Sequence, residues 1–346
     1  MAAPEAGPAG AVMEPYDANA MDEVNAWKQR RFAQPSRRLV PKAVRARLAQ
    51  VGGAAKQGFE ALPGADRFEA LLADALRGLT DLGSRAAQAS VRREAIIKAY
   101  QKRGHPVTSL EDIRTLGLRE IDKVKPRLGL AYIAASTVEG VGAGLLASGG
   151  TVLAAGGTVL GAGAGAAPGA GLVVGAMAAD AAAVLLASHR LVAHTAAYYG
   201  YDVEDPHERL IALGVLGVGT AEAGKAAAYV ELNRTVQALA RRQTWQQLNS
   251  QAVTKIVRRV YAVLGMRLTQ RKLAQAIPVA GVVIGAGLNA KLLARIEDDA
   301  NHLYRERFLR DKYGIAPTPP VPSGGEDDAV KLSEIIEAEI VEGGDR

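Results

Sequence analysis

Histidine and carboxylate side chains are the residues of this chain whose types and spacing could support metal or acid–base chemistry. Asp298 and His302 are four residues apart, so they can share one face of a helix and supply two ligands to a metal ion. Asp180 precedes His189 and His194, and a carboxylate–imidazole pair can hold and transfer a proton. For both sets a structural ion pair or cap is the alternative, and we favour that interpretation.

Composition and motifs exclude several other kinds of site. The chain has 346 residues and no cysteine, so it forms no disulfide, no thiolate metal site and no cysteine nucleophile. It contains no HExxH and no GxSxG sequence, and its GxGxxG-like spacings lie in a glycine-rich run without a preceding strand. We expect no metal, no cofactor and no catalysis. A hydrolase is the alternative, with a polar cluster of Asp180, His194, Asp298 and His302 as its site.

Charge is distributed unevenly along the chain, and this is a stronger signal than the net charge of +6. Residues 1–26 carry five acids and no base, whereas residues 27–59 carry nine bases and no acid. Residues 232–296 carry eleven bases and no acid, and the chain from residue 326 onward has eight acids and two bases. Basic stretches bind the phosphates of nucleic acids or anionic lipids, although a solvated helix face has the same composition.

The two basic stretches supply the residues that we expect to hold lipid headgroups. Trp27 and Phe32 alternate with bases in the first stretch, a pattern that also fits a soluble nucleic-acid binder. No helix-turn-helix, zinc-finger or OB-fold pattern accompanies it, so we favour lipid, where each base near an anionic surface contributes about 1 kcal/mol. The expected headgroup residues are Arg30, Arg31, Arg37, Arg38, Lys255, Arg258, Arg259 and Arg267.

Residues 140–179 form a run of 40 uncharged residues with 13 glycines and 12 alanines. Each glycine costs a helix about 1 kcal/mol relative to alanine, so water alone would not maintain a helix of this composition. Small residues at four-residue spacing let helices pack backbone to backbone. The glycines that we expect to do so, here and in a second uncharged run, are Gly157, Gly161, Gly165, Gly171, Gly175, Gly281 and Gly285.

The same run predicts a helical hairpin that turns near Pro168 and inserts into lipid, where the backbone must satisfy its own hydrogen bonds. A hairpin buried among the protein's own helices, or a loop, is the alternative. Asp180 leaves the second arm too short to cross a bilayer without burying a carboxylate, so we expect the hairpin to enter one leaflet or to pack against other helices, and a full double span with Asp180 paired is the disfavoured alternative. Bases flank the run and none lies at its centre, which predicts that both ends face the cytoplasm.

Apolar residues recur at helical spacing through the body of the chain, which predicts an all-α multi-helix bundle. Asp205, followed by Pro206 and Glu208, has the residue types that begin a helix. Near the end, VKLSEIIEAEIV predicts a short amphipathic helix that docks on a partner or on the chain's own body. We divide the chain into a disordered acidic head and basic arm (1–58), a helical domain (59–315) and a Pro-rich linker with an acidic tail (316–346).

Three segments resemble the EcsC family. They are YQKRGHPVTSLEDIRTLGLREID at 100–122, AAYYGYDVEDPHERLIALGVL at 196–216 and IPVAGVVIGAGLNAKLLARIEDDANHLYRERFL at 277–309. The family takes its name from a protein encoded with the components of a bacterial ABC transporter. The resemblance implies a bacterial, helical, membrane-associated protein, and it carries over no catalytic residues. The family's glycine-rich run before an acidic residue is matched here by the run before Asp180.

These observations lead to one expected function. We expect a scaffold or modulator of membrane or envelope processes that associates peripherally or monotopically with the inner face of the cell membrane. Its expected partners are anionic lipids, with a membrane protein as a second candidate and nucleic acid disfavoured. The sequence leaves the oligomeric state open.

Overall fold

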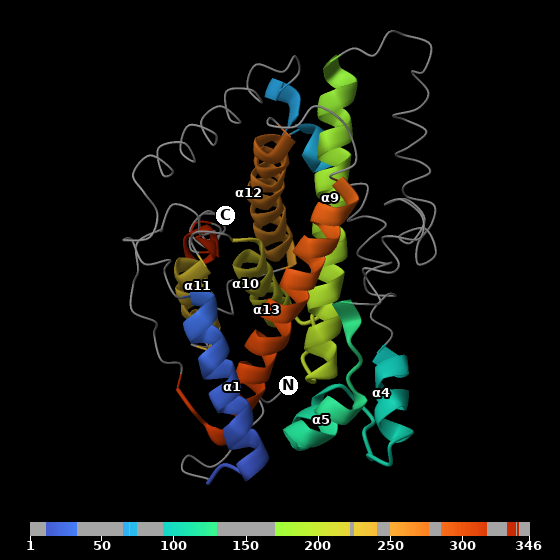
Figure 1. The fold of residues 1–346 in the computed structure, drawn as a ribbon, viewed down its shortest axis with the longest axis vertical. Coiled ribbons are helices and arrows are strands. Elements are labelled where there is room, and N and C mark those ends of the chain that lie inside the picture. The colour runs from blue at the N-terminus through green and yellow to red at the C-terminus, as the bar shows by residue number, and fades with distance from the viewer. Residues whose placement is uncertain are drawn as a thin grey trace.

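The structure is a computed structural model that describes residues 12–32, 65–68, 70–74, 93–129, 170–221, 225–240, 250–276, 285–316, 331–336 and 338. Within these residues it is helical and contains no strand, which confirms the all-α prediction. Two 3-10 helices cover Ala65–Arg67 and Glu111–Thr115. The α-helices are α1 (Pro15–Phe32), α4 (Arg93–Gln101), α5 (Leu118–Val124), α9 (Ala170–Tyr198), α10 (Pro206–Thr220), α11 (Lys225–Ala240), α12 (Ser250–Ala276) and α13 (Gly285–Tyr313) (Figure 1).

Helix α10 is the centre of the bundle. It begins as predicted, because the Asp205 side chain accepts a hydrogen bond from the His207 amide at 2.7 Å and Pro206 occupies the first turn. Every residue from 210 to 220 is buried. A helix that is apolar on all sides must be covered on all sides, and α10 packs against α9, α11, α12 and α13 (Figure 1).

Glycine permits the closest of these contacts. A Cβ atom at Gly214 would lie 2.7 Å from a methyl carbon of Leu232 in α11, which is closer than real Cβ atoms come. A Cβ atom at Gly219 would lie 3.0 Å from Ile296 in α13. The helix backbones therefore approach one another where the side chain is missing, as the small-residue pattern predicts for packed helices in general.

Helix α9 runs without interruption from Ala170 to Tyr198 and passes through Asp180. The turn that follows it contains Gly200, whose φ of +81° favours glycine. Of the expected hairpin, residues 140–169, including the turn near Pro168, lie outside the described residues, and residues 170–179 form the first part of α9. Ala178, Ala182 and Leu185 are at most 1% exposed, so protein packs around this part of the helix. No described helix has the length and apolar character that a bilayer crossing requires.

The N-terminal segment differs from the prediction. We expected residues 1–58 to be disordered, but Pro15–Phe32 form α1, which packs against α13, α5 and α11. Its buried residues are Asp17, Ala20, Val24 and Trp27, spaced by three, four and three positions as on one face of a helix. This face packs on the bundle through Ala20, Val24 and Trp27, and its buried Asp17 pairs with Lys312 of α13 at 2.8 Å.

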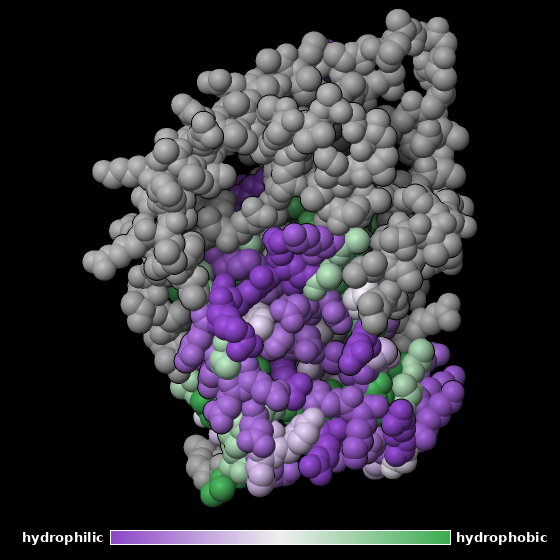
Figure 2. All heavy atoms as spheres, in the orientation of Figure 1, coloured by the Kyte–Doolittle hydropathy of each residue, from purple (hydrophilic) through white to green (hydrophobic). Residues whose placement is uncertain are grey.

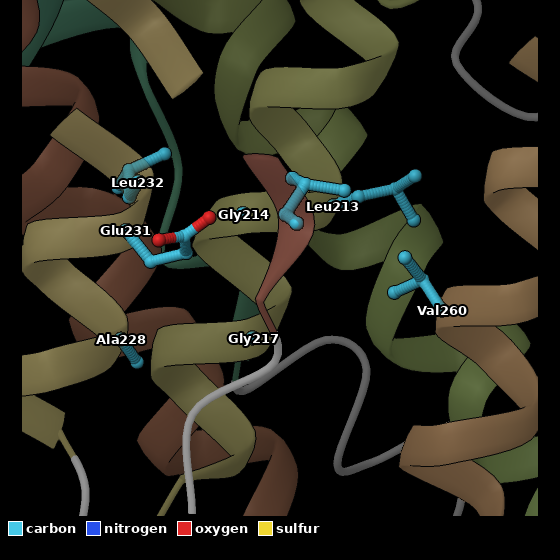
Figure 3. A pocket seen from close by; sticks show the side chains of 8 residues that line it. Leu213, Gly214, Gly217, Ala228, Glu231, Leu232 and Val260 are labelled. Atoms are coloured by element: carbon cyan, nitrogen blue, oxygen red, sulfur yellow. The ribbon is translucent and has the colours of Figure 1, made fainter. Parts of the chain in front are cut away.

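The C-terminal segment at residues 331–336 docks on the body of its own chain. Leu332 and Ile336 are 2% and 3% exposed, and the Ser333 amide donates a hydrogen bond to the Glu231 carboxylate of α11. Leu332 helps to line a small pocket among α10, α11 and α12, whose cavity of about 10 Å³ has space for about one water molecule (Figure 3). Of the two docking modes that the sequence left open, the structure shows the intramolecular one.

Candidate functional site

Helix α12 presents a basic face to solvent. Over 27 residues it carries six bases and no acid, and Lys255, Arg258 and Arg259 are exposed. Arg267 is half-buried two turns further along, and Val263 on the same side is 37% exposed. The opposite face is buried in the core, as its apolar spacing predicts, through Val253, Ile256, Val260, Leu264 and Leu268. We call the exposed residues Lys255, Arg258, Arg259 and Val263 the α12 basic face.

The other expected headgroup residues have different positions. Arg30 is exposed near the end of α1. Arg31, one residue later, instead forms a bidentate ion pair with Asp299 of α13. Arg37 and Arg38 lie outside the described residues. The basic stretch at 27–59 is thus not one continuous headgroup-binding segment, because the fold uses part of it for internal ion pairs.

A buried set of ion pairs joins α1 to α11 and α13, and we call it the paired-charge seam. Its residues are Lys28, Arg31, Lys225, Asp299, Glu306 and Arg310. In Figure 2 the visible face formed by α1, α5 and α13 is largely hydrophilic. Although the face is hydrophilic, both acids of the seam lie beneath it, with Asp299 0% and Glu306 2% exposed.

Asp299 accepts bonds from two cations. The Arg31 Nε and Nη2 atoms lie 2.6 and 2.8 Å from its two oxygens, and the Lys225 Nζ atom lies 3.1 Å away. The Lys225 ammonium also donates to the Val218 carbonyl oxygen at 3.2 Å. Burial lowers the pKa of Lys225 to about 8, although the Asp299 carboxylate acts in the opposite direction. An unpaired buried charge is costly, so these donors stabilise the Asp299 carboxylate in its buried position.

Glu306 is held in the same way. Its carboxylate accepts from Lys28 Nζ at 2.7 Å, from Arg310 Nη2 at 2.7 Å and from the Tyr229 hydroxyl at 2.8 and 2.9 Å. Phe32 stacks on Tyr229 with the ring centroids 4.9 Å apart. The last turn of α1 is therefore fixed to α11 and α13 by charge and by ring packing together.

A second ionic cluster lies where α10 meets α13. Arg307 forms a bidentate pair with Glu208 at 2.5 and 2.6 Å, and its guanidinium carbon lies 4.0 Å from the centre of the Tyr201 ring. The Tyr201 hydroxyl donates to Asp311 at 2.7 Å, and Arg114 also lies over the Tyr201 ring, 5.0 Å from its centre. The EcsC-like segments at 100–122, 196–216 and 277–309 therefore meet at one cluster.

The structure does not gather the polar cluster that we considered as a hydrolase site. Asp180 and His194 belong to one straight run of α9, where 14 residues separate them by about 21 Å along the axis. The His194 ring stacks on Tyr198 at 5.6 Å, and burial lowers its pKa, which favours the neutral form. Two groups at this separation cannot act on the same atom, so the hydrolase interpretation is wrong in the form proposed.

Asp298 and His302 contact α1 rather than a third ligand. The Trp27 indole nitrogen donates to Asp298 Oδ2 at 2.9 Å, and the His302 ring stacks on Trp27 with a centroid distance of 4.5 Å. His302 Nδ1 lies 2.8 Å from the Asp298 carbonyl oxygen. Over the described ranges, no group of three histidine or acidic side chains is arranged to hold a metal. Trp27 is buried, and the half-buried Phe32 ring packs on Trp27 and Tyr229, so both rings already have partners within the fold.

Most of the expected helix-packing glycines lie beyond what the structure describes. Gly171 and Gly175 belong to α9 and Gly285 is the first residue of α13. Gly157, Gly161, Gly165 and Gly281 are outside the described residues. The packing role therefore stays a prediction at these positions, while Gly214 and Gly219 of α10 are glycines in close helix contacts that the prediction did not include.

A cavity of about 240 Å³ opens among α10, α11 and α13, beside the seam. Ile211 and Val215 contribute apolar walls from α10, and Leu232 and Val236 do so from α11. The charged side of the cavity comes from α13, through Glu306, Arg307, Arg310 and Asp311. Concave sites with apolar walls and a few convergent polar groups are the usual form of small-molecule sites.

Comparison with known proteins identifies the family. The model of the EcsC protein family matches residues 67–309. This chain belongs to the EcsC family. It is 29% identical over 228 residues to YdbA of Bacillus subtilis (strain 168), an uncharacterized protein, and the alignment covers 63% of this chain and 69% of YdbA. No solved structure matches the chain. The matched region, residues 67–309, contains neither Asp311 nor α1. Asp311 and α1 nevertheless take part in the contacts described above.

Several residues of the seam were not predicted as partners. Asp299 and Glu306 lie in the same EDDANHLYRER stretch as Asp298 and His302, but the sequence analysis singled out only the latter pair. The available signal was the burial pattern of α1. A helix with Trp27 on its apolar face needs a surface to pack on, and its bases then need acids at that surface.

Proposed function

We propose that this EcsC family protein is a non-enzymatic, peripheral protein of the membrane surface, and that the α12 basic face binds anionic lipid headgroups. The observation that carries the proposal is the exposure of Lys255, Arg258 and Arg259 on a helix that has no acid. A helix with bases on its outer face attracts anionic lipids, and each base near the surface contributes about 1 kcal/mol. Val263 lies among these bases and adds an apolar contact.

The wider role follows from the same surface. A protein that binds headgroups through one helix face acts by position rather than by chemistry. We therefore propose a scaffold or modulator of membrane or envelope processes at the inner face of the cell membrane, with a membrane protein as a further partner. In this proposal residues 140–169, the part of the expected hairpin that precedes α9, add an apolar insertion that makes attachment partly independent of salt.

Vesicle flotation with the full-length chain tests the headgroup site. The triple variant Lys255→Gln, Arg258→Gln and Arg259→Gln should bind vesicles of phosphatidylglycerol and phosphatidylcholine on the order of 100-fold more weakly, because three contributions of about 1 kcal/mol are lost. The matched control replaces Lys102, Arg103 and Lys123, which are exposed bases of the α4–α5 region, and changes the net charge equally.

Three outcomes separate the parts of the proposal. Equal losses in the triple variant and its control would show that net charge matters and the α12 basic face does not. Headgroup selectivity would be contradicted if the wild-type protein bound vesicles of phosphatidylcholine alone as strongly as vesicles that also contain phosphatidylglycerol. Full release of the wild-type protein by 1 M NaCl would contradict the insertion of residues 140–169 while leaving the headgroup site intact.

A further inference from the structure

The docked segment at residues 331–336 lies beyond the region that matches the EcsC family, and a short apolar contact holds it on the bundle. Leu332 and Ile336, four positions apart on one helix face, are 2% and 3% exposed. The Ser333 amide donates to the Glu231 carboxylate of α11. A helix of this length is marginal in water, so the segment keeps its place only while these contacts hold it. Docking of the segment is therefore a reversible step.

The segment lies beside the helix that carries the α12 basic face. Leu332 and Val260 line the same small cavity, and Val260 directly follows Arg259 along α12 (Figure 3). Residues 337–346, which we call the tail end, span at most about 33 Å of extended chain beyond Ile336. Lys255 is five residues from Val260, or about 8 Å along the helix axis. The tail end is therefore long enough to reach the bases of the α12 basic face.

The charges of the tail end and of α12 are complementary. The tail end has four acids and one base, and its acids are Glu337, Glu339, Glu342 and Asp345. Helix α12 has six bases and no acid. A covalent tether keeps the two groups at a high effective concentration, which a lipid surface in solution has to match. Carboxylates and lipid phosphates bind the same cationic side chains, so the tail end and anionic lipid compete for them.

We propose that the α12 basic face is the docking surface of the chain's own tail end, which competes there with anionic lipid. The inference rests on the headgroup role proposed above for this face, and it adds the regulation of that role. Leu332 and Ile336 act as the anchor of the competitor, because they hold its carboxylates close to Arg258 and Arg259. When the anchor leaves its pocket, the tail end moves away from α12 and the affinity for anionic lipid rises.

Vesicle flotation of the full-length chain tests the anchor. The double variant Leu332→Ala and Ile336→Ala keeps every charge and should bind vesicles of phosphatidylglycerol and phosphatidylcholine about 10-fold more tightly than the wild type. That factor equals roughly 1.4 kcal/mol, the contribution of one to two bases at an anionic surface. Ser333→Ala is the matched control, because its main-chain amide still donates to Glu231, and it should bind as the wild type does. Wild-type affinity in the double variant, with faster hydrogen exchange at residues 331–336, would overturn the proposal.

The carboxylates of the tail end are tested separately. Glu337→Gln, Glu339→Gln and Glu342→Gln together should strengthen binding to the same vesicles by a similar factor while the anchor is intact. In the background of the anchor double variant they should add less than about 2-fold, because the carboxylates are no longer held beside α12. Equal gains in the two backgrounds would show that net charge acts without docking, and the proposal would then be wrong.

A combined variant separates this inference from the headgroup site itself. In a chain that carries Lys255→Gln, Arg258→Gln and Arg259→Gln, the anchor double variant should no longer increase vesicle binding. A gain that persists there, or that also appears on vesicles of phosphatidylcholine alone, would place the effect outside the α12 basic face and overturn the inference. If the three α12 substitutions leave binding unchanged, the headgroup site fails. If they weaken binding and the anchor variant has no effect, only the competition by the tail end fails.

Discussion

The paired-charge seam and the α12 basic face use the same side chains for opposite purposes. At the seam, Lys28 and Arg31 reach buried carboxylates at 2.6–2.8 Å and hold α1 on the bundle. On α12, Arg258 and its neighbours are exposed on a helix without acids. A base that faces a buried acid stabilises the fold, whereas an exposed base such as Arg258 contacts solvent. Net charge alone does not distinguish the two, but the position of the acids does.

Removal of a seam carboxylate should have the largest effect on stability. Asp299→Asn leaves Arg31 and Lys225 facing a neutral amide inside the protein, and breaking a buried ion pair costs about 3–5 kcal/mol. We expect the free energy of unfolding in urea to fall by that amount. Asp298→Asn is the matched control, because Asp298 is the preceding residue, is exposed, and loses only part of one bond to Trp27. Equal losses in the two variants would mean that the seam does not hold α1.

A buried titratable group without an opposite charge sharpens the comparison. His189 packs against Tyr261 of α12, and burial, with smaller contributions from Arg209 and Arg190, lowers its pKa to about 4. The seam keeps its charges because they are paired, whereas His189 avoids its charge by staying neutral. The region around α9 should therefore respond to acid through this histidine.

The sign of that response follows from proton linkage. Between pH 6.5 and 4 the unfolded chain binds a proton at His189 that the folded chain does not, so stability falls as the pH falls through this window. The part of the free energy of unfolding that depends on neutral His189 is fully present above pH 6.5 and amounts to on the order of 3 kcal/mol. We expect His189→Gln to remove that part of the pH dependence in urea unfolding at pH 7 and pH 4.5. An identical difference between the two pH values in variant and wild type would contradict the assignment.

The docked C-terminal segment shows a third kind of contact, one that depends mainly on apolar burial. Leu332→Ala should weaken docking by about 2 kcal/mol, because it removes most of a fully buried leucine side chain. Amide hydrogen exchange at residues 331–336 should then be about 30-fold faster, with little change in the exchange of α10. Lys331→Ala is the control, since Lys331 is exposed and its ion pair with Glu334 lies at the surface. Unchanged exchange in Leu332→Ala would show that Leu332 does not hold the segment.

The sequence predicted the parts of the fold that depend on local rules. Asp205 and Pro206 marked the start of α10, and the helical spacing of apolar residues predicted the all-α fold. These features arise from residues close in sequence, so a pattern of spacing is enough to find them.

The sequence did not predict the contacts that join distant segments. Arg31 and Asp299 are 268 positions apart, and nothing in either local sequence names the other. Long basic stretches look uniform in the sequence, but tertiary packing divides them into internal and external bases. The catalytic interpretation of Asp180 and His194 was wrong for the same reason, since residues of useful types are functional partners only where the fold brings them together.

The smallest expected effect on stability is at the α12 basic face, and it is best measured beside the same substitution at the seam. Arg31→Gln and Arg258→Gln are the same chemical change at the seam and on the α12 basic face. We expect Arg31→Gln to lower the free energy of unfolding by about 2 kcal/mol, because Asp299 loses its bidentate partner. Arg258→Gln should change it by less than about 0.5 kcal/mol, as surface substitutions usually do.

The two variants should then exchange their order in a binding experiment. Arg258→Gln should weaken flotation with anionic vesicles by about 5-fold, the effect of about 1 kcal/mol, because the exposed base contributes to the headgroup surface. Arg31→Gln remains folded in buffer without urea, and under that condition it should float with the vesicles as the wild type does. The assignment of the two regions would be reversed if Arg258→Gln lowered the free energy of unfolding and Arg31→Gln weakened vesicle binding. The base at the seam would then bind the lipid, and the exposed base would stabilise the fold.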